Sequence, residues 1–109
     1  MELKRVVVTG LGAITPLGHN VADTWAAVVD GVSGAGPITR FDASLFKTQF
    51  ACEVKDFDPS LYFDRKEARK YDRYAQYAVI AAKEGVEDSG LDLEKVNKNR
   101  VGVIFAAGI

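Results

Sequence analysis

The sequence lacks the features that would place it in an oxidising compartment or a membrane. It carries one cysteine in 109 residues, which excludes an intrachain disulfide. No apolar run approaches the length of a transmembrane helix. Lys4 and Arg5 precede a short apolar run, but no A-x-A cleavage site follows, so we expect no signal peptide. These absences predict a cytoplasmic protein.

An excess of charge is also missing. The formal net charge is −1, which gives no reason to expect a nucleic-acid or membrane-surface partner. Apolar residues make up 48% of the chain, enough for a core, and this argues against disorder. The length is that of one small domain.

The chain opens with a β-branched run at residues 6–8, which predicts a strand covered on both faces. The glycine turn at 10–12 follows, and strand, turn and helix in that order are typical of nucleotide sites. The dinucleotide fingerprint needs a third glycine opening a helix. Thr15 and Pro16 stand there instead, and the helix is expected only after Asn20 as N-cap. We therefore set the dinucleotide interpretation aside.

Apolar spacing predicts three helical segments. The first covers residues 20–31 and carries Trp25 as an anchor in the core. A short charged helix is expected within 64–71. The clearest helix covers 72–89 and stops at Gly90, and its alanine-rich stripe predicts close packing against another element.

Two further strands are predicted, a brief one at residues 50–54 and a fully buried one at 100–107. Strands separated by helices predict crossover connections and a mostly parallel α/β sheet. Such a sheet needs cover on both faces, which so few strands cannot provide. We therefore expect residues 1–109 to be one partial domain, the front piece of a larger α/β protein.

The single cysteine and the single histidine, Cys52 and His19, are ingredients of thiolate catalysis. Glu53 adjoins the cysteine, and a neighbouring carboxylate disfavours a thiolate. We expect Cys52 to be a small buried thiol and His19 an exposed loop imidazole. For residues 1–109 we expect no catalytic residue, no metal and no other cofactor.

Basic residues gather in one stretch. Five cations fall within it, offset by Asp64, Glu67 and Asp72, and these cations are Arg65, Lys66, Arg69, Lys70 and Arg73. On a continuous helix they would form a ridge. The pattern alone fits a solvated face with i,i+4 pairs or a docking surface for an acidic partner.

Several motifs recur in order along the chain. They are V-V-V-T-G-L-G-A-I-T-P-L-G at 6–18, G-P-I at 36–38, R-F-D at 40–42, V-K-D-F at 54–57, D-R-K-E at 64–67, R-K at 69–70 and R-V-G-V-I at 100–104. Together they resemble the opening of the β-ketoacyl-[acyl-carrier-protein] synthases, the condensing enzymes of fatty-acid synthesis. The likeness is greatest to type II, the elongation enzyme.

This resemblance implies a thiolase-like layered α/β fold and a homodimer. It implies an acyltransferase that moves an acyl group from its carrier to a cysteine and condenses it with malonyl carrier protein, releasing carbon dioxide. The family's cysteine and two histidines lie beyond residue 109, so the fragment alone is expected to be inactive. The alternative is a non-catalytic partner resembling a chain-length factor, or a polyketide synthase subunit.

The resemblance also assigns residues. Lys66, Arg69 and Lys70 match positions that dock the acidic acyl carrier protein. Gly108 and Ile109 match a Gly-Ser-Gly-Ile segment whose isoleucine lines the acyl-chain pocket near the dimer interface. The chain carries alanines at 106–107 where that segment has Gly-Ser, a departure that bears on pocket shape and chain-length preference.

Overall fold

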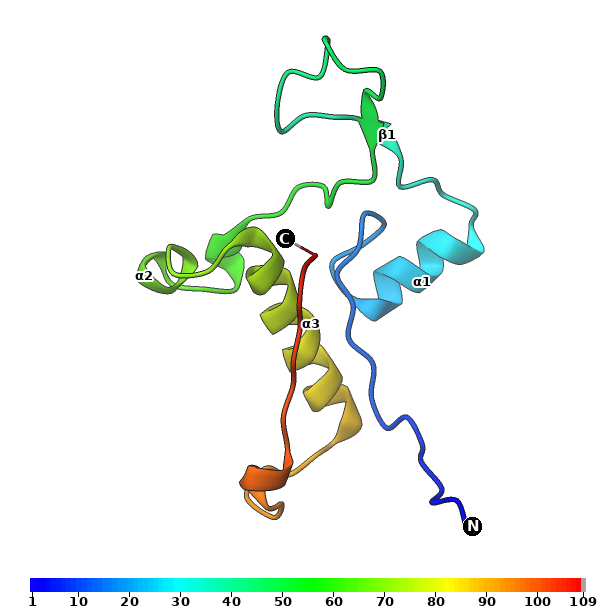
Figure 1. The fold of residues 1–109 in the computed structure, drawn as a ribbon, viewed down its shortest axis with the longest axis vertical. Helices are drawn as coiled ribbons and strands as arrows, with labels where there is room; N and C mark the ends of the chain where they lie inside the picture. Colours follow the sequence, from blue (N-terminus) through cyan, green and yellow to red (C-terminus); the bar gives the residue numbers. More distant parts are fainter. Residues whose placement is uncertain (109) are drawn as a thin grey trace.

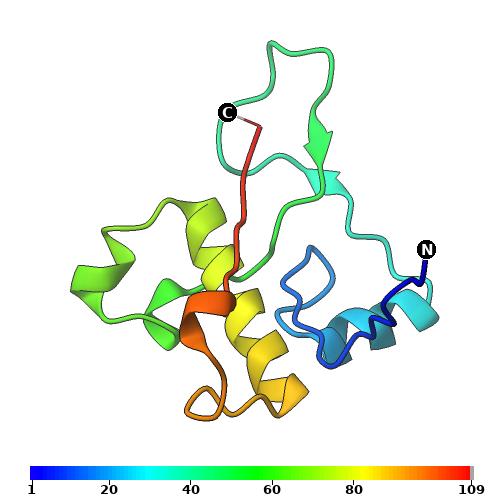
Figure 2. The ribbon, with the colours of Figure 1, turned by 60° about the horizontal axis from the view of Figure 1, so that its bottom comes forward.

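The computed structural model describes residues 1–108 as an open arrangement of helices around α3 (Figures 1 and 2). The elements in order are α1 Val21–Val29, β1 Gly36–Pro37, β2 Phe50–Ala51, η1 Pro59–Leu61, α2 Arg65–Ala68, α3 Arg73–Ser89 and η2 Lys98–Arg100, where η marks a 3-10 turn. The radius of gyration is 17.3 Å, against about 13 Å for a compact domain of this length. No helix in this part of the chain is long and apolar enough to cross a membrane.

The helices begin and end where side chains or glycine satisfy free backbone groups. Asn20 caps α1, since its Oδ1 accepts a hydrogen bond of 2.8 Å from Asp23 N. Asp58 caps η1 in the same way, with Pro59 in the first position. Gly90 ends α3 with φ 67°, a left-handed conformation that suits glycine. The three predicted helices are thus confirmed.

The N-terminal segment approaches α3 so closely that only glycine fits. A Cβ on Gly12 would overlap the Ala81 carbonyl oxygen and come within 2.7 Å of Gly85 N. A Cβ on Gly10 would come within 2.5 Å of Ser89 N. The glycines of this turn therefore serve helix packing, a use unrelated to phosphate binding.

Carboxylates on α3 hold the same segment. Asp88 accepts a hydrogen bond of 2.9 Å from Leu11 N. Glu84 accepts one of 2.9 Å from Ala13 N and another of 2.9 Å from Val21 N, the first residue of α1. Glu84 thereby joins the glycine turn, α1 and α3, and its charge faces the positive end of α1.

The two predicted buried strands are absent from residues 1–108. Neither residues 6–8 nor residues 101–107 form a strand, and Val6 is 89% exposed and Ile104 96% exposed. A strand must pair its backbone groups with a neighbouring strand, and no described segment pairs with either. Both strand predictions are therefore wrong for this part of the chain.

The described sheet is a two-residue antiparallel ladder in which Gly36 faces Ala51 and Pro37 faces Phe50. The brief strand predicted at 50–54 is confirmed in shortened form, but the mostly parallel sheet is not found. The loop 38–49, which we call the finger, projects beyond the ladder (Figure 1).

One hydrogen bond to α3 and one contact with Glu53 hold the base of the finger. Arg40 Nη2 donates a 3.0 Å hydrogen bond to the Tyr77 hydroxyl, and Arg40 Nε lies 4.0 Å from Glu53 Oε1. The finger therefore has a fixed root.

Helix α1 leaves its apolar face open to solvent. Trp25 is 65% exposed and Val29 67% exposed. The spacing correctly gives a helix with one apolar face, but the prediction of Trp25 as a core anchor is wrong, because nothing within residues 1–108 covers that face. The buried apolar residues of the described chain are Ala43 and Ile80.

Candidate functional site

The basic cluster does not form one continuous ridge. Helix α2 ends at Ala68, and α3 begins only at Arg73. The Arg73 guanidinium lies over the Phe57 ring, 4.9 Å from its centroid, which separates it from the other cations. The ridge of five cations is therefore reduced to the four on and just after α2.

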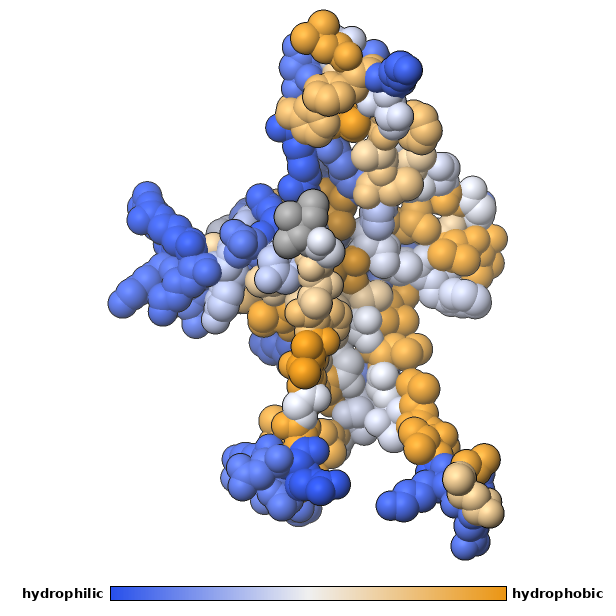
Figure 3. Space-filling view, viewed as in Figure 1, coloured by the Kyte–Doolittle hydropathy of each residue, from blue (hydrophilic) through white to orange (hydrophobic). Residues whose placement is uncertain are grey.

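Those four cations share one exposed surface. Their side chains line a single shallow hollow, and they are Arg65, Lys66, Arg69 and Lys70. The close ion pairs found within residues 1–108 involve other residues. In Figure 3 hydrophilic side chains project into solvent where α2 lies in Figure 1. The arrangement can bind an acidic group without first breaking an internal ion pair.

Local hydrogen bonds place this surface. Asp64 Oδ1 accepts hydrogen bonds of 2.8 Å from Lys66 N and from Glu67 N, which caps α2. At the other end, Gln76 of α3 donates from Nε2 to Ala68 O at 2.9 Å. The predicted docking residues Lys66, Arg69 and Lys70 are thus brought together on one short, capped helix and the turn that follows it.

Sequence reasoning missed Gln76 and Glu84. Gln76, Ile80 and Glu84 follow one another at a spacing of four, so they share one face of α3. Gln76 and Ile80 are the buried residues of α3, whereas Val79, on the predicted stripe, is 43% exposed. Two amide or carboxylate side chains on an otherwise apolar face could have signalled buried hydrogen bonding.

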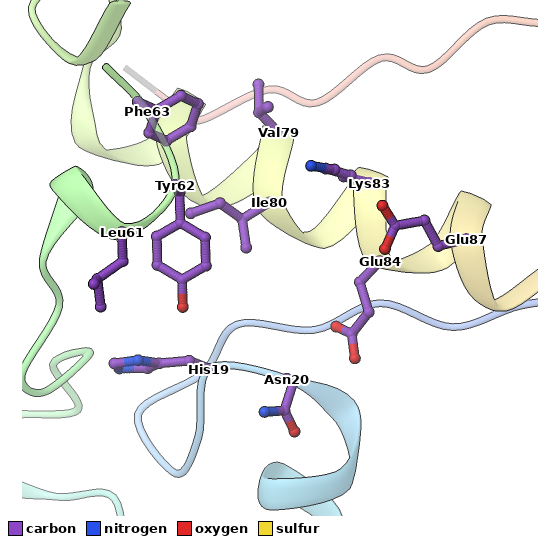
Figure 4. Close-up of a pocket in the computed structure, with 10 residues that line it drawn as sticks. All are labelled: His19, Asn20, Leu61, Tyr62, Phe63, Val79, Ile80, Lys83, Glu84 and Glu87. Carbon is purple, nitrogen blue, oxygen red and sulfur yellow. The ribbon is translucent and has the colours of Figure 1, made fainter. Parts of the chain in front are cut away.

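A cavity lined by both apolar and charged side chains lies beside α3 (Figure 4). Leu61, Tyr62 and Phe63 stand at one end, and the charged side chains of α3 stand at the other. His19 and Asn20 close it from the side of α1. Among the described residues, the side chains that line this cavity include no Ser, Thr or Cys.

Cys52 and His19 do not form a catalytic pair in the described residues. Cys52 is a free, exposed thiol, so the prediction of a buried thiol is wrong. His19 is half-buried where exposure was predicted, and its Nε2 lies 2.6 Å from Lys55 O. The Phe57 ring lies edge-on at 6.2 Å from the imidazole. This imidazole holds the backbone in place.

Carboxylates elsewhere are held in the charged form by short-range donors. Hydrogen bonds from the side chain and backbone of Thr39 outweigh burial and lower the pKa of Glu53. Bonds from Ser44 and Ser60 lower the pKa of Asp42 and Asp58 in the same way. Within residues 1–108 no cluster of three or more His, Cys, Asp or Glu side chains is placed to hold a metal ion.

The predicted acyl-pocket residues lie at the end of the described chain. Gly108 is exposed, and Ile109 lies outside the described residues. The alanines just before them, with Phe105, line a hollow together with residues of the N-terminal segment and α3, among them Ile14 and Tyr77. The hollow lined by Lys66 and its neighbours has no lining residue in common with this one.

Comparison with known proteins gives one family. The family model "Beta-ketoacyl synthase, N-terminal domain" matches residues 3–109. The chain is 53% identical over 109 residues to the 3-oxoacyl-[acyl-carrier-protein] synthase 2 of Coxiella burnetii, and 48% identical over 109 residues to that of Synechocystis. Both matches cover 100% of this chain and 26% of the relative, so the chain spans about a quarter of these relatives' length.

Solved structures agree. The ishigamide ketosynthase/chain length factor matches with a TM-score of 0.71 and 41% identity, covering 83% of this chain and 22% of that one. A type II polyketide synthase acyl-carrier protein in complex with its ketosynthase, bound to the hexaketide, matches with a TM-score of 0.66 and 30% identity, covering 90% and 24%. The described arrangement is therefore that of a part of ketosynthase structures.

Proposed function

Since the chain belongs to the β-ketoacyl synthase family and matches its N-terminal domain, we propose that it is the N-terminal portion of a type II 3-oxoacyl-[acyl-carrier-protein] synthase. Identity of 43% to 53% to curated relatives bearing that name, over nearly the whole chain, is the observation that carries the proposal. The intact protein would be a cytoplasmic homodimer with the thiolase-like layered fold.

The proposed reaction is a decarboxylative Claisen condensation. An acyl group passes from its carrier to a cysteine thiolate, and the carrier leaves as its free thiol. Malonyl carrier protein then loses carbon dioxide, and the resulting carbanion attacks the acyl carbonyl and expels the cysteine thiolate. The cysteine and two histidines that do this in the family lie beyond residue 109, and Cys52 is not proposed as the nucleophile. Gly108 and Ile109 remain proposed contributors to the acyl-chain pocket.

The role proposed for the described residues is carrier docking. Lys66, Arg69 and Lys70 lie together on an exposed surface with no close acidic partner among residues 1–108. An acidic carrier would be attracted over several ångströms before contact, which raises the association rate more than the final affinity. The solved ketosynthase complex with an acyl-carrier protein supports a partner of this class.

Charge reversal of the three cations in the intact protein tests docking. We expect the triple variant Lys66→Glu, Arg69→Glu, Lys70→Glu to lower kcat/KM for carrier-bound substrate about 10- to 100-fold relative to a small acyl thioester. Raised salt should weaken the wild-type preference for the carrier, since exposed charges are screened beyond about 8–10 Å.

A control makes the same change in net charge elsewhere, by Lys47→Glu, Lys95→Glu and Lys98→Glu, on the finger and around η2. It also breaks the exposed ion pairs of Lys95 with Asp92 and of Lys98 with Glu94, which lowers the activity with both substrates alike if it lowers it at all. The control should keep the wild-type ratio between the two substrates. Equal losses with both substrates in the triple variant, or none with either, would place the carrier site on another surface and leave the family membership intact.

A second candidate function is a non-catalytic partner resembling a chain-length factor. It is favoured by the 41% identity to a solved ketosynthase/chain length factor. The two candidates differ in whether the intact protein alone forms 3-oxoacyl product from acyl and malonyl carrier proteins. Product formation supports the synthase, and its absence with a folded, carrier-binding protein supports the partner.

A further inference from the structure

Gln76 stands out as a buried polar side chain that the proposed chemistry does not use. It lies in the first turn of α3 with 5% of its surface exposed. Its Nε2 donates to Ala68 O at 2.9 Å and to Tyr71 O at 3.4 Å. These carbonyls belong to the last residue of α2 and to the turn before α3, where helix-end carbonyls need an outside donor.

Helix α2 depends on such outside bonds because it has four residues. A helix of one turn is unstable by itself, since nucleation fixes several residues for a single hydrogen bond. Asp64 fastens its start. Asp72, at the N-cap position of α3, makes no side-chain cap hydrogen bond, so its carboxylate does not fasten the turn. Gln76 is therefore the side chain of α3 that closes the far end of α2.

The Gln76 amide can face only one way. Turning it over would set Oε1 against the oxygens of Ala68 and Tyr71, which are acceptors as well. In the observed orientation Oε1 has no hydrogen-bond partner among residues 1–108. A buried acceptor without a partner costs free energy. Both of the hydrogen bonds that the amide makes with the protein come from its N–H groups.

We propose that Gln76 is a positioning residue for carrier docking, which fixes Lys66, Arg69 and Lys70 in one array by fastening α2 to α3. This inference rests on the proposed docking function. Arg69 and Lys70 lie between the two residues whose carbonyls Gln76 binds. Without those bonds the cations would spread over many positions, and docking would first have to order them.

The test replaces Gln76 by methionine in the intact protein, which keeps the side-chain length but removes both N–H donors. Amide hydrogen exchange should become faster at residues 66–71 while the middle of α3 stays protected. The ratio of kcat/KM for carrier-bound over small thioester should fall about fivefold, as expected for two lost hydrogen bonds of modest net strength.

The finger supplies a matched control. Gln49 Nε2 also bridges two carbonyls, Ser44 O at 3.3 Å and Phe46 O at 3.2 Å, so Gln49→Met loses the same chemistry away from α2. Its substrate ratio should stay at the wild-type value. If Gln76→Met does not fold, Gln76→Asn serves, because its shortened amide cannot reach Ala68 O.

The outcomes separate this inference from docking itself. An unchanged ratio in the Gln76 variant, while the triple charge reversal lowers it, overturns the positioning role and leaves docking in place. An unchanged ratio in both overturns docking and the inference with it. An equal loss with carrier-bound and small substrates marks general damage and also overturns the positioning role.

Discussion

Helix α3 and the segment 101–105 each carry an isoleucine among apolar residues, but the two isoleucines differ in their exposure to solvent. Ile80 of α3 is 8% exposed, and Ile104 is 96% exposed. The helix completes its backbone hydrogen bonds within itself, so it can form and then gather neighbours. The segment 101–105 can complete its own only beside another strand, and no described segment pairs with it.

The neighbours that α3 gathers come from distant parts of the chain. The glycine turn touches its backbone, Glu84 binds backbone amides of the turn and of α1, and Tyr77 meets the finger. Local features of the sequence specify α3, and the glycine turn, α1 and the finger are then positioned by contacts with it. The segment 101–105 also lies beside α3 (Figure 1), but it stays extended with Ile104 open to solvent, because no described strand pairs with it.

The largest loss of stability is expected at the glycine turn, which lies directly against α3. We expect Gly12→Ala to destabilise the intact protein by about 3 kcal/mol, at the upper end for overpacking, because the new Cβ meets backbone atoms of α3 that cannot swing away. Chemical unfolding of wild type and variant measures the difference.

Gly36→Ala is the matched control, since a Cβ there meets nothing within 4 Å. It should stay within about 0.5 kcal/mol of wild type. A similar loss at both glycines would mean that contact with α3 is not what the turn requires, and the contrast between α3 and the open segments would lose its main support.

A smaller loss is expected from weakening the carboxylate that joins the turn to α1. Glu84→Gln keeps the shape but turns an N–H group toward one of the two amides it bound, Ala13 N or Val21 N. The expected cost is about 1–3 kcal/mol, that of leaving a polar group poorly paired. Thermal or urea unfolding of the intact protein would show it.

Glu87→Gln, one turn further along α3, is the control and should change the unfolding free energy little, because Glu87 is exposed. Equal losses at the two positions would point to the charge of α3 as the stabilising factor. That result would remove Glu84 as a specific link between α1 and α3.

The sequence predicts features that depend on nearby residues. The cap at Asn20 and the stop at Gly90 could be read from it because each satisfies backbone groups within a few positions. The exposure of Trp25 could not, because spacing shows which face is apolar but not what covers it. Gln76 was missed for a related reason, since its partners lie beyond a helix break that the charge pattern did not reveal.

The docking cations show both cases together. Their closeness in the chain, on α2 and the turn that follows it, can be read from the sequence, and the structure adds that Asp64 caps α2. The separation of Arg73 from the other cations depends on a contact with Phe57, sixteen residues earlier in the chain. Contacts of that kind are set by tertiary structure, so charge spacing alone overstates the ridge.

The smallest effect concerns the root of the finger, where the Glu53 carboxylate lies against Thr39 and Arg40. Thr39 Oγ1 donates to Glu53 Oε2 at 2.8 Å, and this bond is the main reason that the pKa of Glu53 is lowered. A carboxyl group whose pKa falls on folding stabilises the protein above its unfolded-state pKa. That stabilisation disappears as the pH drops through the folded-state pKa.

Thr39→Val should therefore reduce the free energy of unfolding slightly at neutral pH. The gap in stability between variant and wild type should close in the acid range below the ordinary glutamate pKa. Unfolding midpoints of both proteins from pH 7 downward measure this gap, and Thr48→Val on the same finger controls for the loss of a hydroxyl. A gap that stays constant with pH would show that the Thr39 bond does not act through the charge of Glu53, and one that widens in acid would reverse the sign of the linkage.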